Sequence, residues 1–158
     1  MIPAGSKSLW FVLGMAFCLP LAAAAVDLKS PELVRNGLRT LAYVQDDMVR
    51  KLPTRSYSRL PHENQEFQEA AVPMREAVAA EPAAFRAKVD AQLKKAQAAA
   101  NAVAEVSATG DEARITAAVQ AVADALKSLD GLFPEALRPV PGQLGAGPGR
   151  GGPPPELR

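Results

Sequence analysis

The residues best suited to chemistry in this sequence gather in one short run, His62-Glu63-Asn64-Gln65-Glu66, which holds the chain's one histidine. In a helix, His62 and Glu66 share a face at four-residue spacing, and an imidazole nitrogen and a carboxylate oxygen there suit a divalent metal ion. A dedicated site takes three or four ligands, and no second histidine completes one. Acidic residues near a helix start are also favoured by the helix dipole. We therefore interpret the run as the beginning of a helix and predict no metal-binding residue.

Nucleophiles and paired acids elsewhere in the chain lack the partners that catalysis requires. A serine nucleophile needs a histidine base, but Ser56 and Ser58, the serines near His62, stand in a polar stretch that we expect to be a loop. Carboxylates adjacent in sequence point about 100° apart on a helix and do not converge on a substrate. Two such pairs occur, Asp46 with Asp47 and Asp111 with Glu112. We predict that both pairs lie on solvated faces, that no residue is catalytic, and that the protein is not an enzyme.

Soft metal binding and anion binding also have simpler explanations. Met48 and Met74 with His62 would suit copper, but both methionines fall at apolar helix positions, where methionine is ordinary core. The basic residues of the third helical segment occur together with acidic ones, as on a solvated helix face. These residues are Arg86, Lys88, Lys94 and Lys95, with Glu81 and Asp90 as the acids. We therefore predict no cofactor-binding residue and no bound cofactor.

The first 25 residues have the pattern of a secretory signal peptide. Lys7 precedes an apolar run from Leu9 to about Ala25, and the run ends in four alanines, the small residues that a signal peptidase reads. We expect cleavage after Ala25, with cleavage after Ala24 as the alternative. A membrane anchor that stays uncleaved is the other interpretation, because the run is nearly long enough to span a bilayer. Cleavage predicts a periplasmic protein with no stable membrane insertion.

Removal of the signal changes the composition of the chain. The whole sequence has 18 Lys and Arg against 17 Asp and Glu, and without Lys7 the two balance. A neutral chain gives no electrostatic reason to expect a nucleic-acid partner. The one cysteine, Cys18, and the one tryptophan, Trp10, are lost with the signal. The remaining domain would have no disulfide, no thiolate metal site and no covalently attached haem, so its apolar core must stabilise it.

Four segments then show apolar residues three or four positions apart, the spacing of amphipathic helices. We expect Ser30 to cap the first helix with its hydroxyl and residues 53–60 to form a loop. The four helices are expected over Pro31 to Leu52, Pro61 to Ala80, Pro82 to about Ser107, and Ile115 to Phe133.

Two positions inside this pattern affect the helices directly. Pro73 removes one backbone donor from the second helix, so we expect a kink or a break there. Gly110 marks the turn before the fourth helix, which is capped either by Asp111 or by the pair Thr109 and Glu112.

The predicted core collects the inward-facing residues of the helices. Its main members are Phe67, Met74, Phe85, Leu93, Val103, Val122, Leu126 and Phe133. Ala96 and Ala100 on the third helix either allow close helix packing or leave a groove for an apolar small molecule or a partner's helix. Both interpretations are consistent with the sequence.

From Arg138 onward the chain becomes rich in Gly and Pro, a composition that buries too little apolar surface to fold. Short connections between the helices favour neighbours that run in opposite directions. We therefore predict an all-α fold with three parts. These are a signal peptide over residues 1–25, an antiparallel four-helix bundle over 26–137 and a disordered tail over 138–158.

In its export signal, its helices and its ending over residues 126–133, the chain resembles the cytochrome c′ and cytochrome b four-helix superfamily. Members of the cytochrome c′ type attach haem through Cys-x-x-Cys-His on the last helix, followed three positions on by an aromatic residue. The corresponding residues here are Leu126 and Leu129 for the cysteines, Asp130 for the histidine and Phe133 for the aromatic. Only the aromatic residue is kept, so the resemblance implies the fold in a form without haem.

Taken together, these patterns predict an exported, non-enzymatic binding or structural protein of the cell envelope. Its partner would be an envelope protein or an apolar small molecule. The alternative is a carrier of a non-covalent cofactor or metal, built around His62 and the bundle core.

Overall fold

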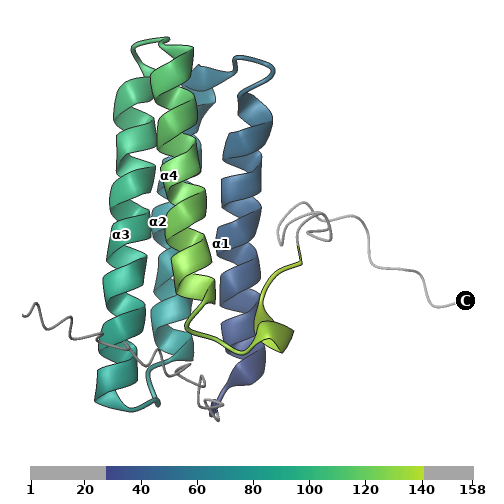
Figure 1. The fold of residues 1–158 in the computed structure, drawn as a ribbon, viewed down its shortest axis with the longest axis vertical. Coiled ribbons are helices and arrows are strands. Elements are labelled where there is room, and N and C mark those ends of the chain that lie inside the picture. The colour runs from purple at the N-terminus through teal and green to yellow at the C-terminus, as the bar shows by residue number, and fades with distance from the viewer. Residues whose placement is uncertain (1–27, 141–158) are drawn as a thin grey trace, which may run out of the picture.

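The structure, a computed structural model, describes residues 28–140 (Figure 1). All regular elements within that range are helical, which confirms the predicted all-α class. The long helices are α1 (Pro31–Lys51), α2 (Leu60–Ala77), α3 (Ala83–Ser107) and α4 (Glu112–Asp130), and the short 3-10 helices are η1 (Tyr57–Arg59) and η2 (Glu135–Leu137). The predicted signal peptide and the part of the predicted tail beyond residue 140 lie outside the described residues.

The starts of α1 and α4 differ in how they are capped. Pro31 opens α1, but the Ser30 hydroxyl makes no capping hydrogen bond, so that prediction is wrong. Only the Ser30 backbone carbonyl contributes, and it accepts the Val34 N–H at 3.1 Å. At α4 the Asp111 carboxylate accepts the Arg114 N–H at 3.1 Å. Of the two alternatives for this cap, the structure therefore selects Asp111.

The end of α1 is closed by a turn rather than by an open loop. The Ser56 N–H donates to the Lys51 carbonyl, and the Arg55 N–H donates to the Leu52 carbonyl, each at 3.1 Å. This pair of bonds is the Schellman motif, whose left-handed position usually holds glycine. Here Arg55 occupies it with φ 51°. The turn before α4 uses the more usual residue, because Gly110 has φ 67°.

Pro73 does not interrupt α2, which continues to Ala77, so of the predicted alternatives, a kink or a break, the break is wrong. Proline leaves the carbonyl four residues earlier, that of Glu69, without its helical partner. Both Pro73 and Glu69 are exposed, so solvent can hydrate the freed carbonyl. The helix also ends three residues before the predicted Ala80.

The four long helices lie side by side, and the chain reverses direction at each connection (Figure 1). Each helix packs against the next in sequence, α1 also contacts α4, and η2 packs on α1. The two helices α1 and α2 approach each other closely at Gly37. A Cβ atom there would lie 2.8 Å from Met74 Sδ and 3.3 Å from Met74 Cα. A residue without a side chain is therefore required for this helix pair to pack as it does.

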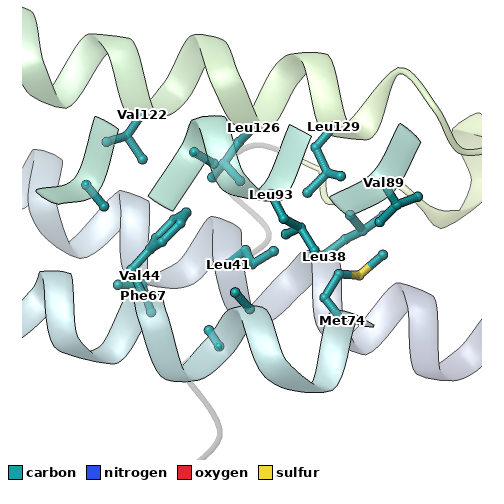
Figure 2. Packing of buried hydrophobic residues seen from close by; sticks show 14 of the residues in the cluster. Leu38, Leu41, Val44, Phe67, Met74, Val89, Leu93, Val122, Leu126 and Leu129 are labelled. Atoms are coloured by element: carbon teal, nitrogen blue, oxygen red, sulfur yellow. The ribbon is translucent and has the colours of Figure 1, made fainter. Parts of the chain in front are cut away.

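The core runs along the centre of the four helices (Figure 2). Seven of the eight predicted core residues are buried, and the eighth, Phe85, is partly buried. Its ring meets the Phe133 ring edge-on, with centroids 5.6 Å apart. The sequence reasoning missed three buried leucines that lie outside the predicted helices, Leu28, Leu60 and Leu137.

The alanines of α3 are used for packing. Ala96 and Ala100 are fully buried, with 0% of their surface exposed. A groove open to solvent would leave these side chains accessible, so the structure does not support an open groove there. Close packing of α3 against its neighbours is the interpretation that agrees with the burial.

Candidate functional site

The start of α2 keeps His62 and Glu66, the possible metal ligands of the sequence analysis, on one face and turns Glu63 of the same run away from them. His62 Nε2 lies 3.2 Å from Glu66 Oε1, and the His62 side chain is 69% exposed. Glu63, one position on and about 100° around the helix, points inward and is only 4% exposed. Within residues 28–140, no three side chains of the His, Cys, Asp and Glu types group closely enough to hold a metal ion. His62 and Glu66 thus offer two ligands on an open surface.

Glu63 instead meets the end of α1. Lys51 Nζ lies 3.0 Å from Glu63 Oε1 and 3.9 Å from Asp47 Oδ2. Arg50 pairs with Asp47 at 3.3 Å and also with Asp46. The Asp47 side chain is only 17% exposed, so the solvated position predicted for it is wrong. We refer to Asp47, Lys51 and Glu63 as the Lys51 cluster.

Two oxygen atoms near the start of α2 are buried without a hydrogen-bond partner in the described part of the chain. They are Glu63 Oε2 and the Tyr57 hydroxyl oxygen. Leaving a buried acceptor unpaired costs roughly 1–3 kcal/mol. The Lys51 cluster is therefore held in place by a single short ion pair, and its carboxylate is incompletely compensated.

A second polar set runs along the contact between α2 and α3. Gln97 Nε2 donates to Gln68 Oε1 at 2.7 Å, and Gln68 Nε2 donates to the Gln97 carbonyl at 3.3 Å. Arg75 donates to Gln97 Oε1 at 2.6 Å and to Asp90 Oδ1 at 3.0 Å. Hydrogen bonds from Lys94 and then Arg75 lower the pKa of Asp90. These side chains, which we call the polar seam, bind one another and so fix the register of α2 against α3.

The remaining predicted polar groups are placed near the surface. Glu112 Oε2 pairs with Arg55 at 2.9 Å, and both side chains are more than half exposed. The basic residues Arg86, Lys88 and Lys95 are exposed on α3, as predicted for a solvated face. By contrast, Met48 and Met74 are fully buried. They belong to the core, as the sequence predicted, and are separated from the exposed His62.

The positions that correspond to haem attachment lie at the end of α4. Leu126, Leu129 and Phe133 are buried in the core. Burial raises the pKa of the half-buried Asp130 to about 6, partly opposed by the positive charge of Arg138. Arg138 itself donates from Nε and Nη2 to the Phe133 carbonyl at 3.0 and 2.8 Å. This end of α4 is thus an apolar anchor for the segment that follows it.

Another buried acid lies at the same end of the molecule. Glu81, in the connection between α2 and α3, is 5% exposed, although the sequence reasoning assigned it to a solvated face. Its Oε1 accepts the backbone N–H of Lys29 at 2.7 Å. Among the ion pairs of the described residues, none includes Glu81. This contact holds the residues before α1 against the α2–α3 connection.

The chain was compared with three sets of known proteins. Neither the family models, nor the curated proteins, nor the solved structures give a match to the chain. The resemblance to the cytochrome c′ type therefore rests on the residue pattern alone. Separately, none of the helices between residues 28 and 140 combines the length and the apolar character needed to cross a membrane.

The buried acid of the Lys51 cluster was missed although the sequence carries a signal for it. Glu63 stands three residues after Leu60 and four before Phe67, which is the spacing of the apolar stripe. Lys51 likewise follows Val44 by seven residues. Opposite charges in the stripes of two successive helices indicate an interhelical ion pair rather than two solvated faces.

Proposed function

We propose that this chain is an exported antiparallel four-helix bundle that loses residues 1–25 and acts in the periplasm as a non-enzymatic binding or structural protein of the cell envelope. Two contacts, each between one residue of α1 and one residue of α2, support the antiparallel arrangement of these helices. Gly37, in the first half of α1, lies against Met74, near the end of α2. Lys51, at the end of α1, pairs with Glu63, near the start of α2.

The observation that carries the non-enzymatic part of the proposal is how the polar side chains are used. In the polar seam, Gln68 and Gln97 donate to each other at 2.7 and 3.3 Å, and Arg75 donates to Gln97 at 2.6 Å. In the Lys51 cluster, the lysine is engaged by two carboxylates. Catalysis instead needs groups that converge on a place where a substrate can sit. Here the groups bind one another across helix contacts, although Glu63 Oε2 stays without a hydrogen-bond partner, and this use favours a scaffold.

The proposed partner is an envelope protein that contacts either an outer helix face or the C-terminal tail. The tail was predicted to begin at residue 138, but Arg138 donates two hydrogen bonds to the Phe133 carbonyl, so the disorder that we propose begins after it. An apolar small molecule between the helices is less compatible with the complete burial of Ala96 and Ala100. The cytochrome-like layout fits the same proposal, since Leu126 and Leu129 fill the core where a haem would be attached.

Site-specific photo-crosslinking in cells tests this proposal. A photoreactive residue is placed at one exposed position per helix, at Arg39, Val72, Lys95 and Ala121, and at one position in the tail, and the periplasmic fraction is analysed. We expect a discrete adduct from one or two adjacent helices and none from the opposite side. The mass of the processed chain reports cleavage. An unprocessed chain in the cytoplasmic fraction, or no adduct at any position including the tail, would contradict the proposal.

A second candidate, a carrier of a non-covalent cofactor or metal, is favoured by one observation only. His62 and Glu66 already lie 3.2 Å apart on one helix face. Protein purified from its native compartment distinguishes the two candidates through its visible spectrum and metal content. We expect a colourless protein without stoichiometric metal. An absorption band or a bound metal that is lost in a His62→Ala variant would favour the carrier instead.

A further inference from the structure

Four exposed charges on α2 and α3 take no part in the ion pairs of residues 28–140. They are Glu69 and Glu76 on α2, and Lys88 and Lys95 on α3. The Glu69 carboxylate accepts one hydrogen bond, from Gln65 Nε2 at 3.0 Å. Because α2 and α3 lie side by side (Figure 1), a helix with unpaired acids adjoins a helix with unpaired lysines.

These charges alternate with exposed apolar residues at helical spacing. On each helix, two like charges stand three or four positions to either side of an apolar residue, so the three side chains share one side of the helix. Val72, between the two acids, is 51% exposed. Ala91, between the two lysines, is also exposed and leaves room for a larger side chain. We call Glu69, Val72 and Glu76 the acidic face, and Lys88, Ala91 and Lys95 the basic face.

The two faces also lie at the same level along the molecule. The α2 and α3 helices run in opposite directions, so each step forward along α2 corresponds to one step back along α3. Their register is given by two contacts of the polar seam, Gln68 with Gln97 and Arg75 with Asp90. From this register, Glu69 is within one residue, or about 1.5 Å, of the level of Lys95. Glu76 is likewise within one residue of the level of Lys88.

We propose that the acidic face of each copy of this chain binds the basic face of a second copy in a symmetric dimer. A half-turn about an axis parallel to the helices keeps every level and places α2 of one copy over α3 of the other. Glu69 then meets Lys95 of the second copy, and Glu76 meets its Lys88. Between these ion pairs, Val72 packs on Ala91. Twofold symmetry repeats each contact, so the charges of both faces are paired.

The size of the contact predicts a weak dimer. With 18 residues, α2 is about 27 Å long, and two helices side by side are about 20 Å wide. Each copy thus offers about 500 Å², and the total of about 1,000 Å² is at the low end for specific interfaces. We expect a dissociation constant on the order of 10–100 µM. High salt should raise it about fivefold or more, because the ion pairs stay near solvent. The dimer requires neither the proposed export nor the envelope partner.

Two charge-swapped variants test the dimer. One carries Glu69→Lys and Glu76→Lys, and the other carries Lys88→Glu and Lys95→Glu. Each variant alone has like charges at every pair, so we expect its dissociation constant to be at least about 30-fold higher. In an equal mixture, each altered face meets one of the opposite charge, and a dimer of the two variants should form with about the unmodified affinity. Sedimentation velocity of protein purified from its native compartment measures these constants.

A matched control separates the contact from net charge. Asp124→Lys with Glu135→Lys adds the same charge as the first variant, at exposed positions on α4 and η2, and should leave the dissociation constant within about threefold. Circular dichroism verifies that the variants fold. A chain that stays monomeric at about 1 mM in low salt, swapped variants that still dimerise alone, or a mixture that stays monomeric would each overturn the proposal.

A crosslink in the otherwise unmodified chain gives a test that does not depend on the charge variants. With a photoreactive residue at Val72, we expect an adduct of twice the chain mass whose linked peptide contains Ala91. A link from Val72 to α2 of the second copy, or an adduct with another protein alone, would contradict the arrangement. The latter result would show that the acidic face binds a different partner.

Discussion

At the scale of single residues, three acids that are buried or half-buried are compensated in three different ways. Glu63 Oε1 lies 3.0 Å from the Lys51 ammonium nitrogen, and Glu81 Oε1 accepts the Lys29 backbone N–H at 2.7 Å. Asp130 is influenced by the positive charge of Arg138, which favours its charged form. A single buried ion pair is sensitive to loss of either partner, because the charge that remains is left without compensation. The stability of the domain should therefore respond strongly and selectively to changes at these positions.

The Lys51→Met variant tests the Glu63 ion pair. Methionine keeps most of the volume but removes the charge, so the Glu63 carboxylate stays buried and unpaired. We expect the free energy of unfolding to fall by about 3 kcal/mol, measured by urea unfolding followed by circular dichroism.

The controls for this prediction separate charge from volume. Replacing both partners, Lys51→Met with Glu63→Leu, should restore most of the stability, because well-packed apolar residues replace a buried pair at little cost. Lys94→Met breaks the exposed pair with Asp90 and should cost less than about 1 kcal/mol. If Lys51→Met is as mild as Lys94→Met, the Lys51 cluster is not buried as described.

The Asp130→Asn variant should remove a pH dependence of stability. Because the folded pKa of about 6 exceeds the ordinary value of 3.8, the folded chain holds a proton that the unfolded chain has released between about pH 4 and 6. Stability therefore falls as pH rises through this window and stays lower above it. After allowance for its partial exposure, we expect Asp130→Asn to be more stable by about 1 kcal/mol at pH 7 and nearly unchanged at pH 4.

The pH prediction has a matched control on the same helix. Asp124 is exposed and accepts from Gln120 Nε2 at 3.0 Å, so Asp124→Asn should leave the pH profile of unfolding unchanged. A flat difference between the unmodified chain and Asp130→Asn from pH 4 to 7 would show that Asp130 is hydrated.

At the scale of the helices, two contacts of α1 determine how the chain turns and packs. Its end is closed by the Schellman motif that places Arg55 at φ 51°. Its first half approaches α2 at Gly37, where a side chain would collide with Met74. Glycine is the usual residue at a left-handed position and is disfavoured inside a helix. Here the left-handed position holds Arg55, and Gly37 lies inside α1.

The Arg55→Gly variant should therefore stabilise the domain. Left-handed backbone costs a residue with a side chain about 1–2 kcal/mol, and glycine removes that cost while losing some entropy on folding. The exposed ion pair with Glu112 contributes little. We expect a net gain of about 0.5–1 kcal/mol in thermal or urea unfolding. Arg55→Ala, which loses the ion pair and keeps the backbone strain, should show no gain.

The Gly37→Ala variant should destabilise the domain even though alanine favours helices. The added Cβ would lie 3.3 Å from the Met74 backbone, so α1 and α2 must move apart at a cost of about 1–3 kcal/mol. The neighbouring Asn36 is exposed, and Asn36→Ala should be neutral or slightly stabilising. Equal effects from the two variants, compared by urea unfolding, would mean that the helices are not in close contact at this level.

At the scale of the whole molecule, apolar periodicity was sufficient to predict the helices. The spacing of Val34, Leu38 and Leu41, repeated in the other segments, placed four helices within a few residues of their observed bounds. Burial of Leu126 and Phe133 likewise followed from the pattern of the last segment. Periodicity works here because each helix buries one stripe against a common core.

Contacts between different helices were harder to predict from the sequence. The burial of Glu63 and Glu81 depends on a lysine and a backbone N–H supplied by distant segments. The polar seam depends on the register of α2 against α3, which places Arg75 beside Asp90 and Gln97. Helix propensity and apolar spacing describe one segment at a time, so they do not predict contacts between two helices. For this reason the sequence reasoning considered Glu63 only together with His62, and it missed the pair of Glu63 with Lys51.

The same contacts determine whether the interior of the molecule is closed. Ala100 is fully buried on α3, and Ala98, two positions earlier, is exposed. Ala100→Leu forces extra methylene groups into a filled core, so we expect it to lower the free energy of unfolding by about 1–3 kcal/mol or more. Ala98→Leu adds the same volume to an exposed face and should change stability by less than about 0.5 kcal/mol. Urea unfolding of the two variants provides the comparison. If Ala100→Leu is tolerated as well as Ala98→Leu, space exists between the helices, and an apolar small molecule bound there becomes the better hypothesis for the partner.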